Sequence, residues 1–155
     1  SKPKDFPQNS YFTGFWTEAS DVELDEDLLD FLKNGEPPLV VTFGSMPFDS
    51  KLDLKDLIKS IPEKLKMRVV LVKGWGLRET KELENIPAIK VIDSAPYDKL
   101  FPYAKAVVHH GGIGTLAACL RAGKPFMTCP VLYPMGDQVF WGDIAWRKGI
   151  GLRPL

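Results

Sequence analysis

Several features that would assign a protein to a functional class at once are scarce or missing in this sequence. Only two of its 155 residues are histidines and two are cysteines, which excludes a cysteine-rich scaffold and a multi-histidine metal cluster. Lysine plus arginine and aspartate plus glutamate both number 20, so no overall field attracts nucleic acid or an anionic membrane. No apolar run reaches the roughly eighteen residues of a membrane-spanning helix, and the polar start does not resemble a signal peptide. Any anionic ligand must therefore be held by local groups.

Cys119 and Cys129 lie in apolar stretches and lack the C-x-x-C spacing. This context predicts two buried thiols in a reducing compartment rather than a disulfide. We therefore expect a cytoplasmic protein with no nucleic-acid partner and no membrane span in this chain. The apolar fraction of 45% is sufficient for one packed domain of this length.

The chain divides into two parts. Residues 1–23 show no sustained hydrophobic period and combine prolines with several aromatic residues, a composition typical of an extended interdomain linker. Residues 24–155 alternate short apolar, β-branched runs with amphipathic stretches. We expect strands at 39–43, 67–74, 89–93, 105–110 and 125–130. We expect helices at 24–34, 52–65, 116–122 and 137–149, a weak helix at 97–104, and a short polar helix or loop at 77–85.

This alternation predicts an α/β fold with a Rossmann-like parallel sheet and helices on both faces, because the strands are too apolar to have a wet face. In such sheets, ligands bind beyond the carboxyl ends of the strands. The loops that follow the strands are therefore the places to look for a site. They are residues 44–46, 74–76, 93–95, 109–115 and 133–138.

The most distinctive of these loops is the glycine-rich turn in "AVVHHGGIGTLAACLRAGKP". Gly111, Gly112 and Gly114 precede an apolar helix, where missing side chains let an anion approach backbone N–H groups at the positive end of the helix dipole. Thr115 could cap this helix or donate its hydroxyl to a phosphate oxygen. The spacing matches neither G-x-G-x-x-G nor the P-loop. A tight strand-to-helix turn without any ligand is the alternative.

The two histidines are adjacent at the end of a predicted strand. Successive strand residues face opposite ways, so His109 and His110 cannot both point at one ligand if the strand continues through them. We expect His110, beside the glycines, to face the ligand, and His109 to be a packed or hydrogen-bonded neighbour. A zinc site is disfavoured, because adjacent histidines rarely chelate one ion together.

A second polar pair stands before the last predicted helix. Asp137 could serve only as its N-cap. Together with Gln138, however, it forms a carboxylate and amide pair that suits adjacent sugar hydroxyls.

In this order and at these separations, "VTFGSM", "LFPYAKAVVHHGGIGTLAACLRAGKP" and "GDQVFWG" resemble the carboxyl-terminal half of GT-B fold, UDP-sugar-dependent glycosyltransferases. This superfamily includes the sterol glucosyltransferases and the UDP-glucuronosyltransferases. The likeness covers residues 39–152, and "PQNSYFTGFW" resembles the linker that leads into this half. The resemblance implies that residues 24–155 form a nucleotide-sugar donor-binding domain.

The resemblance also implies a role for individual residues. His110, Gly112, Gly114 and Thr115 would hold the UDP diphosphate. Ser45 would lie near the same phosphates, and Asp137 and Gln138 would contact the donor sugar.

Two positions depart from the plant members of the family. Ser94 stands where they have a tryptophan that stacks on uracil, and Ala118 stands where they have a glutamate that binds the ribose. Trp75 follows another predicted strand, and it is the candidate to form a wall of the nucleoside site in place of the missing tryptophan.

The function implied is that of the donor half of an inverting, metal-independent hexosyltransferase. It would use UDP-glucose as co-substrate without a cofactor, and act on a lipophilic acceptor. The catalytic base would belong to an amino-terminal acceptor domain missing from this chain, so we expect a piece of a longer enzyme that is inactive alone.

Three alternatives remain open at this point. They are a donor subunit of a two-chain N-acetylglucosaminyltransferase, a non-catalytic nucleotide-binding module, and an epimerase of the same fold.

Overall fold

The computed structural model describes residues 4–44, 54–74, 80–132 and 136–155. Its centre is a five-stranded sheet in the order β3-β2-β1-β4-β5, and all four neighbouring pairs are parallel. The strands are β1 Leu39–Thr42, β2 Val69–Val72, β3 Ile89–Ile92, β4 Ala106–His109 and β5 Phe126–Thr128. The predicted Rossmann-like parallel sheet is therefore confirmed, with strands shorter than their apolar runs.

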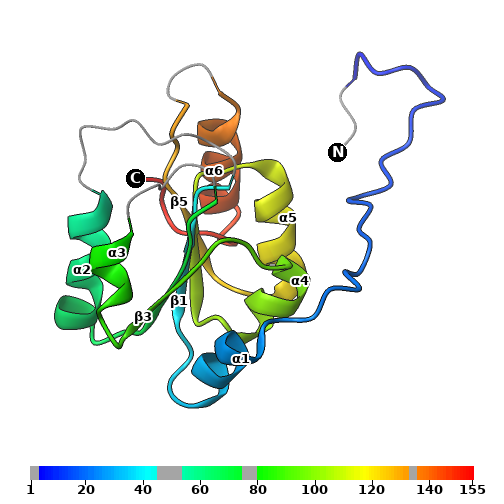
Figure 1. Ribbon diagram of the computed structural model, residues 1–155. Helices are drawn as coiled ribbons and strands as arrows, with labels where there is room; N and C mark the ends of the chain where they lie inside the picture. The colour runs from blue at the N-terminus through cyan, green and yellow to red at the C-terminus, as the bar shows by residue number, and fades with distance from the viewer. Residues whose placement is uncertain (1–3, 45–53, 75–79, 133–135) are drawn as a thin grey trace.

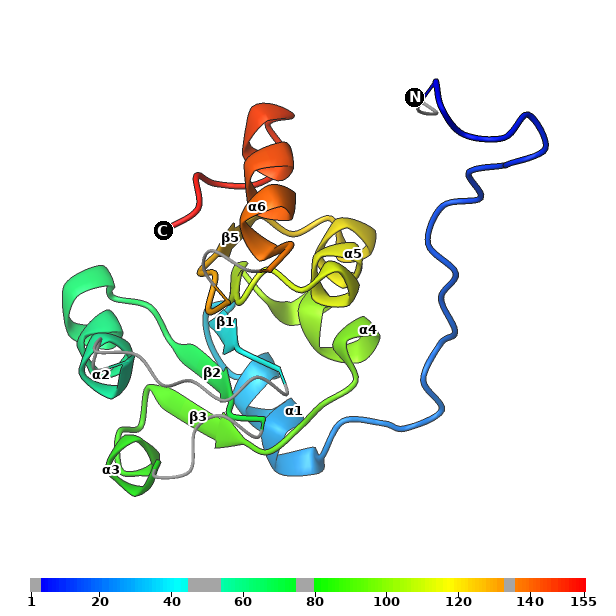
Figure 2. The same cartoon turned by 90° about the horizontal axis from the view of Figure 1, so that it is seen from above.

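Helices follow the strands in the predicted alternation. They are α1 Glu26–Lys33, α2 Leu54–Leu65, α3 Lys81–Glu84, α4 Tyr97–Leu100, α5 Ile113–Ala122 and α6 Gln138–Arg147, with a 3-10 turn at Phe101–Tyr103. Figure 2 shows α2 and α3 on one side of the sheet and α1, α4 and α5 on the other. Helices therefore cover both faces, as predicted.

Alternate strand residues build a core on each face. Val40, Val70 and Val107 pack with α1, α5 and α6 in one apolar cluster. Val41 and Leu71 pack with α2 and α3 in the other. β1 and β2 are buried at every position, as strands in the middle of a covered parallel sheet are.

The start of α5 differs from the prediction. The helix begins at Ile113 with Gly112 as its N-cap, three residues before the predicted start at Leu116. Thr115 is consequently inside the first turn and buried, so it does not cap the helix. The prediction was wrong because the glycines suggested a loop, whereas Gly112 has an ordinary extended N-cap backbone and Gly114 enters the helix.

The amino-terminal segment lies outside the domain body. Residues 10–19 have no regular secondary structure, and Tyr11 and Trp16 are more than four-fifths exposed. Figure 1 shows the segment extending away from the body before it reaches α1. Near that end Ser20 N–H donates to Asp98 Oδ2 at 2.9 Å, and Lys99 Nζ lies 2.7 Å from Glu23 Oε1. The linker role of residues 1–23 stays a prediction.

Candidate functional site

The strand order creates a switch point between β1 and β4. The chain runs outward from β1 through β2 to β3 and then returns to place β4 on the other side of β1. Loops that leave the carboxyl ends of two such strands diverge, and the crevice between them is the usual ligand site of an open parallel sheet. Here those ends carry Gly44 and His110, and the two residues meet. A Cβ atom added at Gly44 would be 3.0 Å from His110 Cε1.

His110 is half-buried and lies beside Gly44 at the carboxyl ends of β1 and β4. Its Nδ1 atom has no hydrogen-bond partner among the described residues. Burial lowers the pKa of His110, and the nearby Asp137 carboxylate opposes that effect. The imidazole is therefore mainly neutral in the free protein at neutral pH. A neutral imidazole can still donate one hydrogen bond to an anion.

The amino-terminal end of α5 borders the same crevice. The Leu116 N–H donates to the Gly112 carbonyl oxygen at 3.0 Å, which closes the first turn of the helix. The N–H groups of Ile113, Gly114 and Thr115 precede it, and such groups have no partner within their helix. Gly114 is exposed, and a Cβ atom built on it would meet nothing within 4 Å. A ligand can thus approach the positive end of the helix closely.

His109 has a different environment. It is fully buried, and its Nδ1 atom accepts a hydrogen bond from the Gly111 N–H at 3.1 Å. Burial lowers the pKa of His109 to about 4, with a smaller contribution from His110. His109 therefore stays neutral and does not reach the crevice, consistent with the expectation that only one histidine faces a ligand.

The Asp137 and Gln138 pair lies at the start of α6, but its members differ in exposure. Asp137 is the exposed N-cap residue and makes no capping bond with its side chain; instead its Oδ2 accepts from Trp141 Nε1 at 2.7 Å. Gln138 is buried, and its Oε1 accepts from the N–H groups of Val131 and Leu132 at 2.8 and 3.1 Å. Its amide oxygen thus holds the preceding loop. Sugar binding by this pair stays a prediction.

The remaining predicted residues lie elsewhere. Ser45 and Trp75 fall outside the described residues. Ser94 is exposed on the segment that connects β3 to α4.

Sequence reasoning missed Tyr97, the first residue of α4. Its hydroxyl is 2.8 Å from Thr42 Oγ1 at the end of β1, and burial raises the pKa of the phenol. Tyr97 also lines a groove of about 360 Å³ that begins beside the glycine turn. The other lining residues are Thr17, Glu18, Asp98, Pro102, Gly114, Ala117, Ala118, Arg121 and Ala122. An aromatic residue directly after the strand-end stretch "DSAP" was the available signal.

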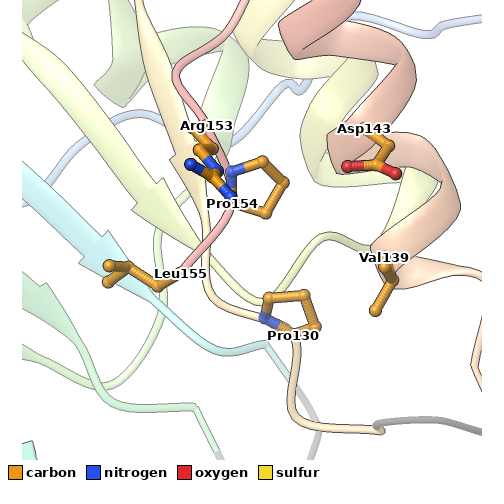
Figure 3. A pocket seen from close by; sticks show the side chains of 6 residues that line it. All are labelled: Pro130, Val139, Asp143, Arg153, Pro154 and Leu155. Carbon is orange, nitrogen blue, oxygen red and sulfur yellow. The ribbon is translucent and has the colours of Figure 1, made fainter.

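A second hollow, of about 250 Å³, lies beside α6 (Figure 3). Asp143 and Val139 of α6 form one wall, and Pro130 lies across from the chain segment that holds Arg153. None of the sequence-predicted site residues lines it, so it is not the candidate site.

Two further properties concern the described part of the chain. Within it, no three histidine, cysteine or carboxylate side chains are grouped as a metal site requires. Nor does any helix in these ranges have the length and apolar character needed to cross a bilayer.

Comparisons with known proteins identify relatives along almost the entire chain, although no family model matches it. It is 37% identical to a sterol 3-beta-glucosyltransferase of Arabidopsis thaliana, over 99% of this chain and 24% of that protein. It is 35% identical to one from Emericella nidulans, over 97% of this chain and 11% of that protein. An O-mycaminosyltylonolide 6-deoxyallosyltransferase of Streptomyces fradiae is 33% identical, over 99% of this chain and 35% of its own length. The chain thus spans about a third or less of these relatives.

Solved structures show the same fold. The glycotransferase of kitacinnamycin matches with a TM-score of 0.70 at 19% identity, over 91% of this chain and 34% of its own. The glycosyltransferase SnogD from Streptomyces nogalater matches with a TM-score of 0.60 at 25% identity, over 94% and 35%. The chain is therefore homologous to the carboxyl-terminal part of the sterol 3-beta-glucosyltransferases, and it belongs to the GT-B glycosyltransferase superfamily.

Proposed function

We propose that this chain binds a UDP-sugar, UDP-glucose first among the candidates, as the donor half of an inverting glycosyltransferase. One observation carries the proposal. The His110 imidazole lies against Gly112, the N-cap of α5, at the carboxyl ends of β1 and β4, so it adjoins the first N–H groups of α5, which have no partner within their own helix. Directed N–H donors at a helix terminus suit a diphosphate, and a histidine adds one more donor.

The same groups would assist the reaction. When the bond between sugar and UDP breaks, negative charge develops on the departing diphosphate. The N–H groups of Gly114 and Thr115 and the His110 imidazole would stabilise that charge without reorganising. Because these donors supply the positive potential, we propose a transfer that needs neither metal nor cofactor.

The groove beside the glycine turn is the place we propose for the nucleoside. It adjoins the diphosphate site at Gly114, and its volume lies at the low end of the range of roughly 300–1,000 Å³ for small-molecule pockets. Ala118 leaves room in it, while Tyr97 and Asp98 supply polar groups. Ribose hydroxyls would bind to these two side chains. Ser94 and Trp75 remain weaker candidates for the base.

The donor sugar would lie toward the start of α6. Asp137 presents an exposed carboxylate there, which can accept hydrogen bonds from hydroxyls. The Gln138 oxygen is engaged by the loop, so only its NH₂ group is left to donate to the sugar. The sterol glucosyltransferases among the relatives support glucose and a lipophilic, sterol-like acceptor.

The catalytic base is proposed to lie in the amino-terminal acceptor domain of the complete enzyme. Neither histidine here suits that role, because His109 is enclosed in the core and His110 would be engaged with the diphosphate. This chain alone would bind the donor without transferring sugar. Its two cysteines are free thiols, which supports our proposal of a reducing, cytoplasmic location.

Calorimetric titration of the chain with UDP, UDP-glucose and TDP-glucose tests the proposal. We expect saturable binding of UDP and UDP-glucose, and weaker binding of the thymidine analogue, whose pentose lacks the 2′-hydroxyl. If none of the three binds saturably, the proposed function is wrong. If TDP-glucose binds most tightly, the diphosphate site stands and the assignment to UDP fails.

A further inference from the structure

His109 is the histidine that the proposed donor site leaves without a role. It is the last residue of β4, and its ring packs against that of Phe126, with the ring centroids 5.4 Å apart. The planes of the His109 and His110 rings are 88° apart. One imidazole therefore belongs to the core and the other to the crevice.

The polar contact of His109 is with the turn itself. Its Nδ1 atom accepts the Gly111 N–H at 3.1 Å, and both residues are buried. Gly111 has a φ of +95°, a conformation that residues with a side chain rarely adopt. β4 ends at His109, so the strand ladder offers this N–H no acceptor. A buried N–H without a partner is costly, and the imidazole supplies this one with an acceptor, although the ring's own Nε2 is buried and has no partner among the described residues.

The turn is also confined from its other side. A Cβ atom at Gly111 would lie 3.0 Å from both Cβ and the carbonyl oxygen of Gln138 at the start of α6. Gly111 is thus held between His109 and the start of α6. The next residue, Gly112, is the N-cap of α5 and lies against His110. A shift of Gly111 would therefore displace both the helix terminus and the imidazole proposed to hold the diphosphate.

We propose that His109 is a positioning residue, whose unprotonated Nδ1 fixes the Gly111 peptide and thereby aims the α5 terminus and His110 at the diphosphate. The inference rests on the proposed function. Since Nδ1 accepts a hydrogen bond, the single proton of the neutral ring is on Nε2. Burial holds the pKa of His109 at about 4, which keeps Nδ1 free to accept at neutral pH. A doubly protonated ring would present N–H to N–H and break the contact.

Substitutions of similar size separate the acceptor from simple packing. In His109→Asn the side-chain oxygen can occupy the place of Nδ1, whereas His109→Leu puts a methyl group there. His109→Gln is a third variant, because its polar atoms reach the place of Nε2 and leave the Nδ1 position apolar. The readouts are the UDP dissociation constant and the hydrogen-exchange rate of the Gly111 amide, measured by NMR on the full chain.

We expect the Leu and Gln variants to bind UDP about tenfold more weakly and to exchange the Gly111 proton faster, because that N–H has lost its acceptor. The Asn variant should remain within about threefold of the original chain in both readouts, since it restores an acceptor. If the Leu variant does not fold, the comparison of Gln with Asn decides the question.

Equal UDP affinity and equal Gly111 exchange in all variants would overturn the proposal. So would a loss in the Asn variant as large as that in the Gln variant, because the effect would then be packing. These outcomes are distinct from a failure of the donor-site proposal, in which the unaltered chain itself does not bind UDP. In that case, Gly111 exchange still tests the contact on which the inference depends.

Discussion

Gly112 lies so close to the His110 imidazole that a Cβ atom at position 112 would be 2.3 Å from His110 Nε2. That separation is well below any normal contact, so even a methyl group there must displace the ring or the turn. Gly112, the N-cap residue of α5, thus packs directly against His110, the histidine proposed to face the ligand. The arrangement links the two halves of the proposed diphosphate site within three consecutive residues.

Gly112→Ala should weaken UDP binding by at least about tenfold, because the displaced imidazole no longer meets the diphosphate. Its N-cap backbone is of an ordinary extended type, so the substitution itself adds little backbone strain. Calorimetric titration with UDP measures the effect. Binding as tight as that of the unaltered chain would show that His110 does not contribute from its observed position.

Gly114→Ala is the contrasting change two residues later. An alanine there meets no protein atom within 4 Å and replaces a glycine inside a helix. The melting temperature should therefore stay the same or rise, since Ala favours a helix over Gly by roughly 0.5–1 kcal/mol. UDP binding should still weaken, because the methyl group would stand between the ligand and the helix N–H groups. Unchanged UDP affinity would place the ligand elsewhere.

Replacing His110 tests its proposed hydrogen bond directly. His110→Ala should weaken the UDP complex by on the order of 1–3 kcal/mol, the value of a hydrogen bond to a charged group. His110→Gln should recover part of this loss, since its amide can donate from a similar position. Titration of both variants with UDP makes the comparison. If the His110→Gln and His110→Ala variants bind UDP equally weakly, the imidazole contributes through packing and not as a hydrogen-bond donor.

Stability should depend on pH through His109. Its pKa is about 4 in the folded protein and 6.5 without the protein environment, so in this interval the unfolded chain binds more protons than the folded one. The free energy of unfolding should therefore fall as the pH is lowered from 6.5 to 4, by on the order of 3 kcal/mol from this residue. Urea unfolding of the original chain and of His109→Asn at pH 7, 6, 5 and 4 would isolate the contribution. The neighbouring His110 is present in both chains.

The difference in unfolding free energy between the two chains should narrow, or reverse in favour of the His109→Asn variant, as the pH falls. A constant difference across this range would mean that His109 is not the buried neutral group described above.

The sequence predicted the features that depend on local pattern. The parallel sheet with helices on both faces follows from the alternation of apolar and amphipathic stretches. The two histidines do differ in burial, as expected, but β4 ends at His109, so strand alternation alone does not explain the difference. Apolar runs located each of the five described strands. The reason is clearest for β1 and β2, which are buried at every position and show no alternation of polar and apolar residues.

What the sequence did not predict depends on contacts between distant residues. The bond between Thr42 and Tyr97 joins positions 55 apart, and no local pattern announces it. Gln138 binds the backbone of Val131 and Leu132 across a loop, which only the folded chain reveals. The start of α5 was misplaced because glycine is usually a helix breaker. Here Gly112 leaves space for the His110 ring that lies against it, and Gly114 faces open space on the helix surface.

The most direct test of the central claim is an NMR titration of the ¹⁵N-labelled chain with UDP, following the backbone amides. If the diphosphate binds at the start of α5, the largest shifts fall on Gly112, Ile113, Gly114 and Thr115, with smaller shifts along the groove at Tyr97 and Ala118. Shifts concentrated at Asp143 and Arg153, in the hollow beside α6, or no saturable shift at any amide, would contradict it.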